Sequence, residues 1–152
     1  MRSALFILLT AVVCAQTPAP RFSDYPPLGT YNGRNAALVL KKNDREFRTR
    51  LRSVAQQPPN FAGHYILTAW GCGAECLIGA VIDANTGNVH WFPHTICCWD
   101  TDVDRPIVSR IDSRLILFIG DRDEKEGDDG EHYYEFVDDT FMHIKSLFGR
   151  KR

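Results

Sequence analysis

The fold is decided by residues 77–92, which read LIGAVIDANTGNVHWF. Branched apolar residues from Leu77 to Ile82 lead into the polar stretch Asp83 to Gly87, and a second strand-like stretch, Asn88 to Phe92, follows it. Asp, Asn and Gly between two such stretches are typical of the tight turn that reverses a chain from one strand to the next. The segment therefore predicts a β-hairpin and, with it, a largely antiparallel sheet.

Further strands are predicted on both sides of this hairpin. Upstream, residues 63–70 alternate Tyr65, Leu67 and Ala69 with the residues of the opposite face, and residues 71–76 read as the turn that follows. Downstream, strands are predicted at residues 107–111, 114–119, 131–137 and 140–147. We expect an α+β domain that is mainly β, an antiparallel meander of about six or seven strands in a curved sheet or a partly closed barrel.

One helix is predicted before the sheet. Asn43 can cap its first turn, and Glu46 completes a pattern that resembles a capping box. Apolar residues then recur at helical spacing, at Phe47, Leu51, Val54 and Ala55. We therefore expect a helix that begins at Asn43, ends before Pro58-Pro59 and packs on the sheet through this apolar stripe.

The N-terminus, residues 1–15, predicts a secretory signal peptide. Arg2 precedes the apolar run Ala4 to Val13, and Val13-Cys14-Ala15 forms a small-residue cleavage site before Gln16. A lipoprotein signal, in which Cys14 carries the lipid, is the competing interpretation, but Val13 stands where Gly, Ala or Ser is usual. The apolar run is too short to span a bilayer, so a secreted or periplasmic protein is expected.

The mature chain divides by composition. Residues 16–42 are rich in Pro and Gly and read as an extended arm, residues 43–148 as a single globular domain, and residues 149–152 as a basic tail. The full chain has 18 basic and 19 acidic side chains, and the signal peptide removes one basic residue. This near balance argues against a nucleic-acid binder, and no later apolar run predicts a membrane span.

The mature chain retains four cysteines, Cys72, Cys76, Cys97 and Cys98, and an even number in an oxidising compartment implies disulfides. Pairing Cys72 with Cys76 would leave the neighbours Cys97 and Cys98 to form a strained ring. Adjacent residues on an extended segment point to opposite sides, so each could reach a different partner. This reasoning favours cross-links between the 72–76 turn and the 97–98 segment, with pairing inside each segment as the alternative.

Residue spacing indicates two candidate metal sites, one for calcium and one for zinc. Asp100, Asp102 and Asp104 alternate as in the first half of a calcium loop, but Arg105 and Ile111 stand where that loop needs Gly and Glu. A solvated loop is therefore favoured over calcium, and no cofactor is expected. For zinc, His90 and His94 lie near the Cys97-Cys98 pair, yet no ligand pair has helical spacing and disulfides compete for the sulfurs. The acidic stretch 121–131 reads as a hairpin loop, with an ion site or docking surface as the alternative.

Candidate active-site residues are few. His64 or His90 with a carboxylate could act as a general base, which keeps a small secreted hydrolase open as an alternative. Paired cysteines cannot act as nucleophiles, and no G-x-S-x-G elbow is present. Aromatic, acidic and imidazole side chains near the cysteines could instead form a contact surface for a glycan or an envelope protein, with packing in the core as the plainer interpretation of the tryptophans. The binding candidates are Trp70, Glu75, Trp91, His94 and Trp99.

Four motifs resemble those of a group of small secreted bacterial proteins of uncharacterised function. They are Asn60-Phe61-Ala62-Gly63-His64-Tyr65, Trp70-Gly71-Cys72-Gly73 with Cys76, Asp83 with Thr86-Gly87, and Asp112-Ser113-Arg114-Leu115, within residues 43–147. The resemblance implies an envelope or extracellular location, a mainly β domain after a helix, and a Cys-x-x-x-Cys that could close on itself. It implies no catalytic residues. We therefore expect a non-enzymatic periplasmic or extracellular binding module, of an envelope or inhibitor-like kind.

Overall fold

Strands β2 (Cys76–Asp83) and β3 (Val89–Trp91) form the predicted hairpin in the computed structural model, which describes residues 18–149. Asp83 closes the turn between them. Its carboxylate accepts hydrogen bonds from the Asn85 backbone N–H, at 2.8 Å, and from the Thr86 hydroxyl, at 2.7 Å. The predicted signal peptide, with Cys14, and residues 150–152 of the basic tail lie outside the described residues.

Eight antiparallel strands form the sheet, and the mainly β fold class is confirmed. The other strands are β1 (Tyr65–Gly73), β4 (Ile96–Cys97), β5 (Ile107–Arg110), β6 (Ser113–Arg122), β7 (Gly130–Val137) and β8 (Thr140–Phe148). Their order is β1-β2-β4-β6-β7-β8, with β3 beside β2 and β5 beside β6, and the sheet does not close into a barrel. The strand that prediction missed, β4, has two residues, which is too short to show an alternating pattern.

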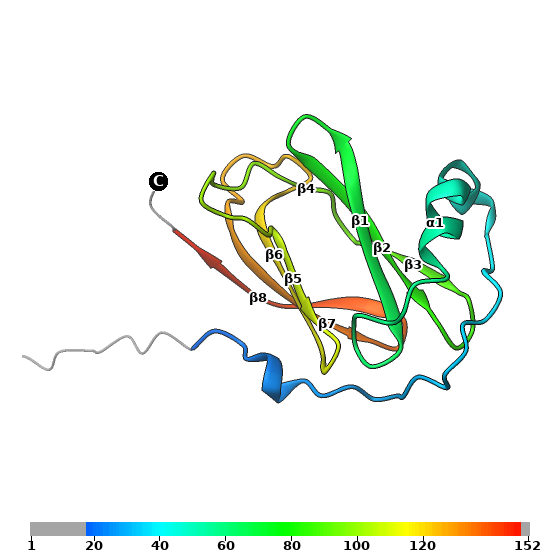
Figure 1. Cartoon of the computed structure of the whole chain (residues 1–152). Coiled ribbons are helices and arrows are strands. Elements are labelled where there is room, and N and C mark those ends of the chain that lie inside the picture. The colour runs from blue at the N-terminus through cyan, green and yellow to red at the C-terminus, as the bar shows by residue number, and fades with distance from the viewer. Residues whose placement is uncertain (1–17, 150–152) are drawn as a thin grey trace, which may run out of the picture.

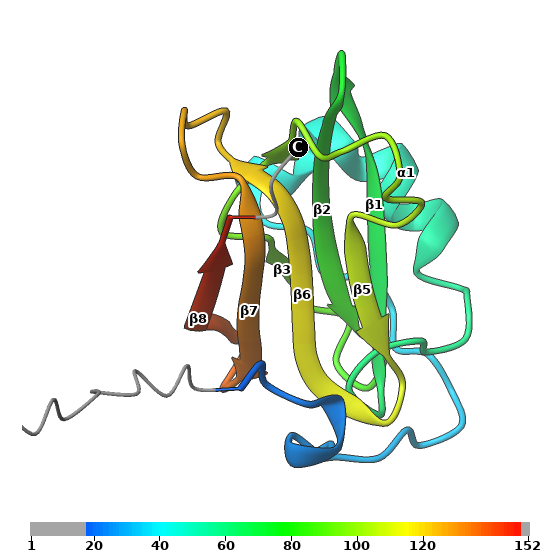
Figure 2. The same cartoon turned by 90° about the vertical axis from the view of Figure 1, so that its left-hand side faces the viewer.

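The sheet is divided into two halves that β4 joins. β4 pairs with β2 through Cys76↔Cys97 and with β6 through Cys97↔Asp121. Figures 1 and 2 show β1, β2 and β3 on one side of the molecule and β5 to β8 on the other. The main core contains buried residues of both halves, namely Phe61, Ala62, Val81, Phe92, Ile96, Ile116, Phe118, Tyr134 and Phe136.

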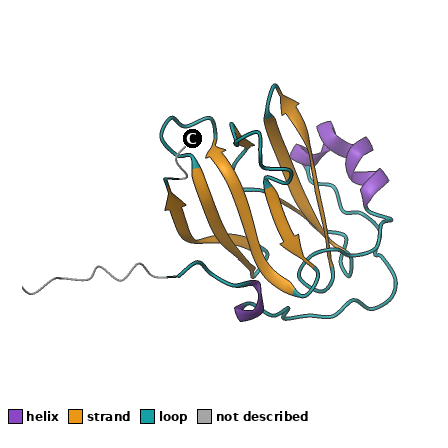
Figure 3. Cartoon of the chain, turned by 60° about the vertical axis from the view of Figure 1, so that its left-hand side comes forward, coloured by secondary structure: helices purple, strands orange, loops and turns teal. Residues whose placement is uncertain are grey.

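The predicted helix covers the outer face of the β1–β2–β3 half, as Figure 3 shows. It consists of a 3-10 turn, η2 (Lys42–Phe47), followed by α1 (Arg48–Val54). The predicted stripe is confirmed, because Leu51 and Ala55 are buried with Ile66, Ala80, Ile82, Ala84 and Val89, and Phe47 and Val54 pack against them.

The predicted start of the helix is wrong. Asn43 and Glu46 do not form its cap; instead the Asp44 carboxylate accepts a hydrogen bond from the Lys41 backbone N–H at 2.6 Å. The same carboxylate accepts the indole N–H of Trp91 at 2.8 Å, and Asp44 is only 2% exposed. The helix therefore begins one residue earlier, because a strand tryptophan that is distant in sequence holds the carboxylate of its first turn in place.

Residues 18–41 run along the outside of the other half and then across to the helix (Figure 1). A short 3-10 turn, η1 (Phe22–Asp24), lies near the start of β6, where the Ser113 hydroxyl donates to the carbonyls of Phe22 and Tyr25 at 2.8 and 3.1 Å. Farther along, a Cβ on Gly63 would lie 2.4 Å from the Gly29 carbonyl oxygen. A glycine at position 63 therefore allows this segment to lie close against the turn before β1.

The predicted cysteine cross-links are wrong. Cys72 is bonded to Cys76, with a Cα–Cα distance of 5.2 Å, and Cys97 and Cys98 are free thiols. The β1–β2 pairing shifts register between Gly71 and Gly73, which places Cys72 at an irregularity beside Cys76. The argument from alternating side chains fails because Cys98 has a φ of +58° and has left the extended conformation. The observed bond is the alternative pairing inside the 72–76 segment, without the second bond between Cys97 and Cys98 that this alternative included.

Candidate functional site

A cleft of about 400 Å³ lies between β3, the turn that joins β7 to β8, and the start of the helix. Its apolar lining comes from Val89, Trp91, Pro93 and Phe141. Its polar lining comes from Lys41, Asn43, Asp44, His90, Asp139 and Thr140. The cleft therefore contains one of the three predicted histidines, His90, and one of the three predicted tryptophans, Trp91.

His90 faces a carboxylate across this cleft. Its side chain is 12% exposed, and its Nε2 lies 3.4 Å from Oδ1 of Asp139, whose side chain is 52% exposed. Within residues 18–149 this nitrogen is buried and has no hydrogen-bond partner of good geometry. A buried polar atom of this kind costs stability unless a further group satisfies it. The Asp139 carboxylate lies close enough to satisfy it after a small side-chain rotation.

Tyr65 contacts the same oxygen of Asp139 that faces His90. The Tyr65 hydroxyl donates to Asp139 Oδ1 at 3.2 Å. Burial, followed by the nearby charges of Asp139 and Asp83, raises the pKa of Tyr65 above its usual range. The phenol is therefore protonated at neutral pH and orients the carboxylate toward His90.

The turn that carries Asp139 is strained. Val137 pairs with Thr140, and the two residues between them, Asp138 and Asp139, have φ values of +49° and +59°. Such two-residue turns favour Asn-Gly, because left-handed conformations cost other residues roughly 1 kcal/mol or more each. Backbone strain of this kind occurs often at functional sites. Here its effect is to hold the carboxylate of Asp139 over the cleft.

Trp91 lines the cleft and also packs against the helix. Its ring lies 5.0 Å from that of Phe47 and 5.7 Å from that of Trp70, and the guanidinium of Arg50 lies 5.7 Å from the Trp70 ring. Trp70 is thus a packing residue between the helix and β1. The structure places Trp91, but not Trp70, among the residues that line the cleft.

His64, the other predicted catalytic candidate, lies elsewhere. Its Nε2 is 3.6 Å from Asp83 Oδ1, and its ring stacks on that of Tyr65 with centroids 4.2 Å apart. The hollow beside it has a volume of about 50 Å³ and is also lined by Gly29 and Arg114. This volume suits a water molecule or two rather than a substrate. Asp83, moreover, already holds the β2–β3 turn.

The other predicted binding residues are not gathered around the cleft. Glu75 and Trp99 line a separate hollow of about 280 Å³ with Cys98, Asp100 and Thr101. His94 Nδ1 lies 2.5 Å from Asp123 Oδ2, and the Thr95 backbone N–H donates to Asp123 Oδ1 at 2.9 Å. Burial opposes ionisation of Asp123, but these hydrogen bonds outweigh it and lower its pKa. A binding role for Glu75, His94 and Trp99 stays a prediction.

The carboxylates proposed for calcium are not brought together. Among the described residues, only Cys97, Cys98 and Asp121 place three or more ligand atoms of His, Cys, Asp or Glu within 4.8 Å of one another. Asp102 and Asp104 are exposed, and the Asp100 carbonyl accepts a hydrogen bond from Val103 in an ordinary turn. The chain therefore offers no convergent oxygen cage at Asp100, Asp102 and Asp104.

Sequence reasoning missed eight of the ten residues that line the cleft, of which the polar ones are Lys41, Asn43, Asp44, Asp139 and Thr140. Asp139 falls between two predicted strands, residues 131–137 and 140–147, and Lys41 falls in the predicted arm. The signal that could have found Asp139 is the turn itself, since Asp-Asp stands where Asn-Gly is favoured.

Comparisons of the chain with protein-family models, with curated proteins and with solved structures found no match. The resemblance inferred from the motifs therefore stays a prediction. Over residues 18–149, none of the helices has the length and apolar character needed to cross a bilayer.

Proposed function

We propose that the chain is an exported binding module that holds a glycan in the cleft beside His90. The observation that carries this proposal is the composition of the cleft, in which Trp91, Pro93 and Phe141 form an apolar wall beside paired acidic and basic groups. Its volume of about 400 Å³ is in the range of small-molecule sites.

A sugar ring matches this lining. Its C–H face is apolar and suits contact with aromatic rings, whereas its hydroxyls both donate and accept hydrogen bonds. Asp139 and Thr140 supply acceptors at the rim, and the amide of Asn43 supplies both kinds of group. If the Asp139 side chain turns aside on binding, the buried Nε2 of His90 gains a partner from a bound hydroxyl.

The charge of the cleft supports an uncharged ligand. Asp44 and Asp139 supply two carboxylates, and Lys41 supplies one ammonium group beside the His90 imidazole. With both signs represented, neither a polyanion nor a polycation is favoured electrostatically.

The test is calorimetric titration of the mature protein with neutral oligosaccharides, including chitin-type and peptidoglycan-derived fragments. We expect saturable binding that weakens at least about tenfold in His90→Ala and Asp139→Asn, since each loses a hydrogen bond worth roughly 1.5 kcal/mol. His94→Ala is the matched control, because this neighbouring histidine contacts Asp123 and does not line the cleft. Equal binding by all three variants would refute the proposal.

A small hydrolase is the second candidate, and the His90–Asp139 pair favours it. A carboxylate 3.4 Å from an imidazole can orient that imidazole as a general base for water. Product formation from the same oligosaccharides, abolished in His90→Ala, would establish this activity. Binding without product would support the binding module.

A further inference from the structure

We propose that Cys97, Cys98 and Asp121 form a binding site for a thiophilic divalent cation of the zinc class. The site lies at the other end of β2 from the glycan cleft and is independent of it. Its argument rests on strand register, on the conformation of Cys98 and on the chemistry of two thiols beside a carboxylate.

Strand pairing brings the first two ligands together. Cys97 on β4 and Asp121 on β6 are direct partners across the antiparallel pair. Side chains at such positions share one face of the sheet, with Cβ atoms about 5 Å apart. Close approach of the strands depends on Gly120, where a Cβ would lie 2.2 Å from the Cys97 carbonyl oxygen.

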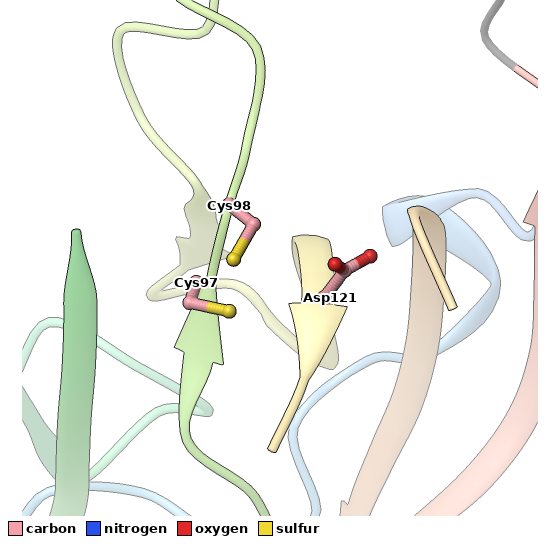
Figure 4. A group of neighbouring side chains, drawn as sticks. All are labelled: Cys97, Cys98 and Asp121. Atoms are coloured by element: carbon pink, nitrogen blue, oxygen red, sulfur yellow. The ribbon is translucent and has the colours of Figure 1, made fainter. Parts of the chain in front are cut away.

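The third ligand is the thiol of Cys98, whose backbone is left-handed. On a continuing strand the Cys98 side chain would point away from that of Cys97. The φ of +58° at Cys98 ends the strand and returns its thiol to the same side. Figure 4 shows the sulfurs of both cysteines directed toward the gap beside Asp121.

The spacing suits a tetrahedral ion. The two sulfurs and a carboxylate oxygen all lie within 4.8 Å of one another. Zinc–sulfur bonds of about 2.3 Å in tetrahedral geometry separate two sulfurs by about 3.8 Å, so small side-chain rotations would complete the contacts. Two thiolates with one carboxylate are a ligand set for zinc rather than for calcium or magnesium.

The surroundings favour a cation over a further negative charge. Cys97 is 1% exposed and Asp121 is 9% exposed. Two thiolates and a carboxylate buried together would repel one another, and the Glu124 backbone N–H donates to the Cys97 sulfur. A bound divalent ion would compensate the negative charge of the thiolates, and the backbone N–H would orient one of them.

Access comes from the hollow that Cys98 lines with Glu75, Trp99, Asp100 and Thr101. Water from this hollow, or the Glu75 carboxylate, supplies the fourth ligand. Binding is an acid–base step without redox change, in which the metal ion replaces the two thiol protons and these pass to the buffer.

The experiment uses the mature protein with the Cys72–Cys76 bond intact and two titratable thiols per chain, and adds Co²⁺ or Cd²⁺ as spectroscopic substitutes for Zn²⁺. We expect one ion per chain, sulfur-to-metal charge-transfer absorption, release of about two protons and displacement of Co²⁺ by Zn²⁺. Bound Zn²⁺ should also protect both thiols from alkylation.

Matched variants separate this site from general thiol chemistry. Cys98→Ser should weaken binding about 100-fold or more and Asp121→Asn about tenfold or more. The exposed Asp102→Asn should bind as the parent does. Circular dichroism confirms folding, and if Asp121→Asn does not fold, the partly exposed Cys98 provides the test. The proposal is overturned if no charge-transfer band appears with both thiols reduced, if Cys98→Ser binds normally, or if Cys97 and Cys98 form a disulfide in the presence of Zn²⁺.

Discussion

Asp128, Arg122 and His132 form a buried polar cluster in the β6–β7 half. The Arg122 guanidinium donates to both oxygens of Asp128, at 2.7 and 2.8 Å, and also to the Tyr134 hydroxyl at 2.9 Å. His132 is fully buried, and its Nε2 lies within hydrogen-bond distance of the Gly120 and Asp128 carbonyls, at 2.9 and 2.8 Å. Since carbonyls only accept, Nε2 carries the proton. Two residues of the predicted acidic loop, Asp123 and Asp128, therefore have structural partners.

This cluster predicts loss of stability in acid. The hydrogen bonds from Arg122 lower the pKa of Asp128 to about 2, and burial, followed by the charge of Arg122, lowers the pKa of His132. Both groups bind protons more readily when the chain is unfolded, so protonation favours unfolding. Stability should begin to fall below about pH 6.5 through His132, and a further loss of roughly 2 kcal/mol should follow between about pH 4 and pH 2 through Asp128.

Urea unfolding measured from pH 7 to pH 3 tests this expectation. His132→Gln should be less stable than the parent at pH 7 but should show a flatter dependence between pH 7 and pH 5. His143→Gln is the control, because His143 is less buried and its replacement should remove less of the slope. An unchanged slope in His132→Gln would contradict the assignment.

At the scale of the element, the left-handed β7–β8 turn lowers the stability of the protein but places the Asp139 carboxylate beside His90. Replacing Asp138-Asp139 by Asn-Gly should stabilise the protein by about 1–2 kcal/mol, because both positions are left-handed and Asn-Gly adopts that conformation at lower cost. The same variant should lose glycan binding, since it removes the carboxylate that faces His90.

The control is Asp138→Asn alone, which keeps Asp139 and should retain binding. Thermal unfolding and calorimetric titration measure the two effects separately. A double variant that is more stable and still binds would show that the turn has no part in the site.

A comparison of the predicted and observed strands shows which parts of the fold can be predicted from the sequence. Runs of branched and aromatic residues between turn residues located β1, β2 and β5 to β8 to within about three residues, because that pattern is local. Local patterns did not reveal β4, whose two residues are held by pairing on both sides. They also misplaced the helix start and the disulfide, because the Trp91–Asp44 hydrogen bond and the left-handed Cys98 depend on tertiary contacts. His90 and Trp91 were predicted site residues, but Asp139 joins them only after β7 and β8 have packed.

At the scale of the whole molecule, the N-terminal segment covers apolar surface that the helix does not reach. Phe22 and Tyr25 pack on the outer face formed by Leu115, Leu117 and Tyr133. Ser113 anchors this contact, because its fully buried hydroxyl donates to two carbonyls of the segment and accepts the Leu115 N–H at 3.1 Å.

Ser113→Ala should therefore destabilise the protein by about 1–2 kcal/mol, since it removes the hydrogen bonds that the buried hydroxyl makes with the segment and with the Leu115 N–H. Hydrogen exchange should accelerate in residues 20–30 and at Leu115 before it accelerates in β1 and β2. Ser109→Ala on the neighbouring β5 is the control. Uniform acceleration along the chain would show instead that the segment and the sheet open together.

The same anchor has a consequence for the order of folding. The Phe22 carbonyl and the Ser113 hydroxyl that bonds it are 91 positions apart. Phe22 can form this hydrogen bond only after the chain as far as Ser113 has been synthesised. Contacts of such long range slow folding and leave apolar surface uncovered in the meantime. Residues 22–25 are thus synthesised well before the strand on which they dock.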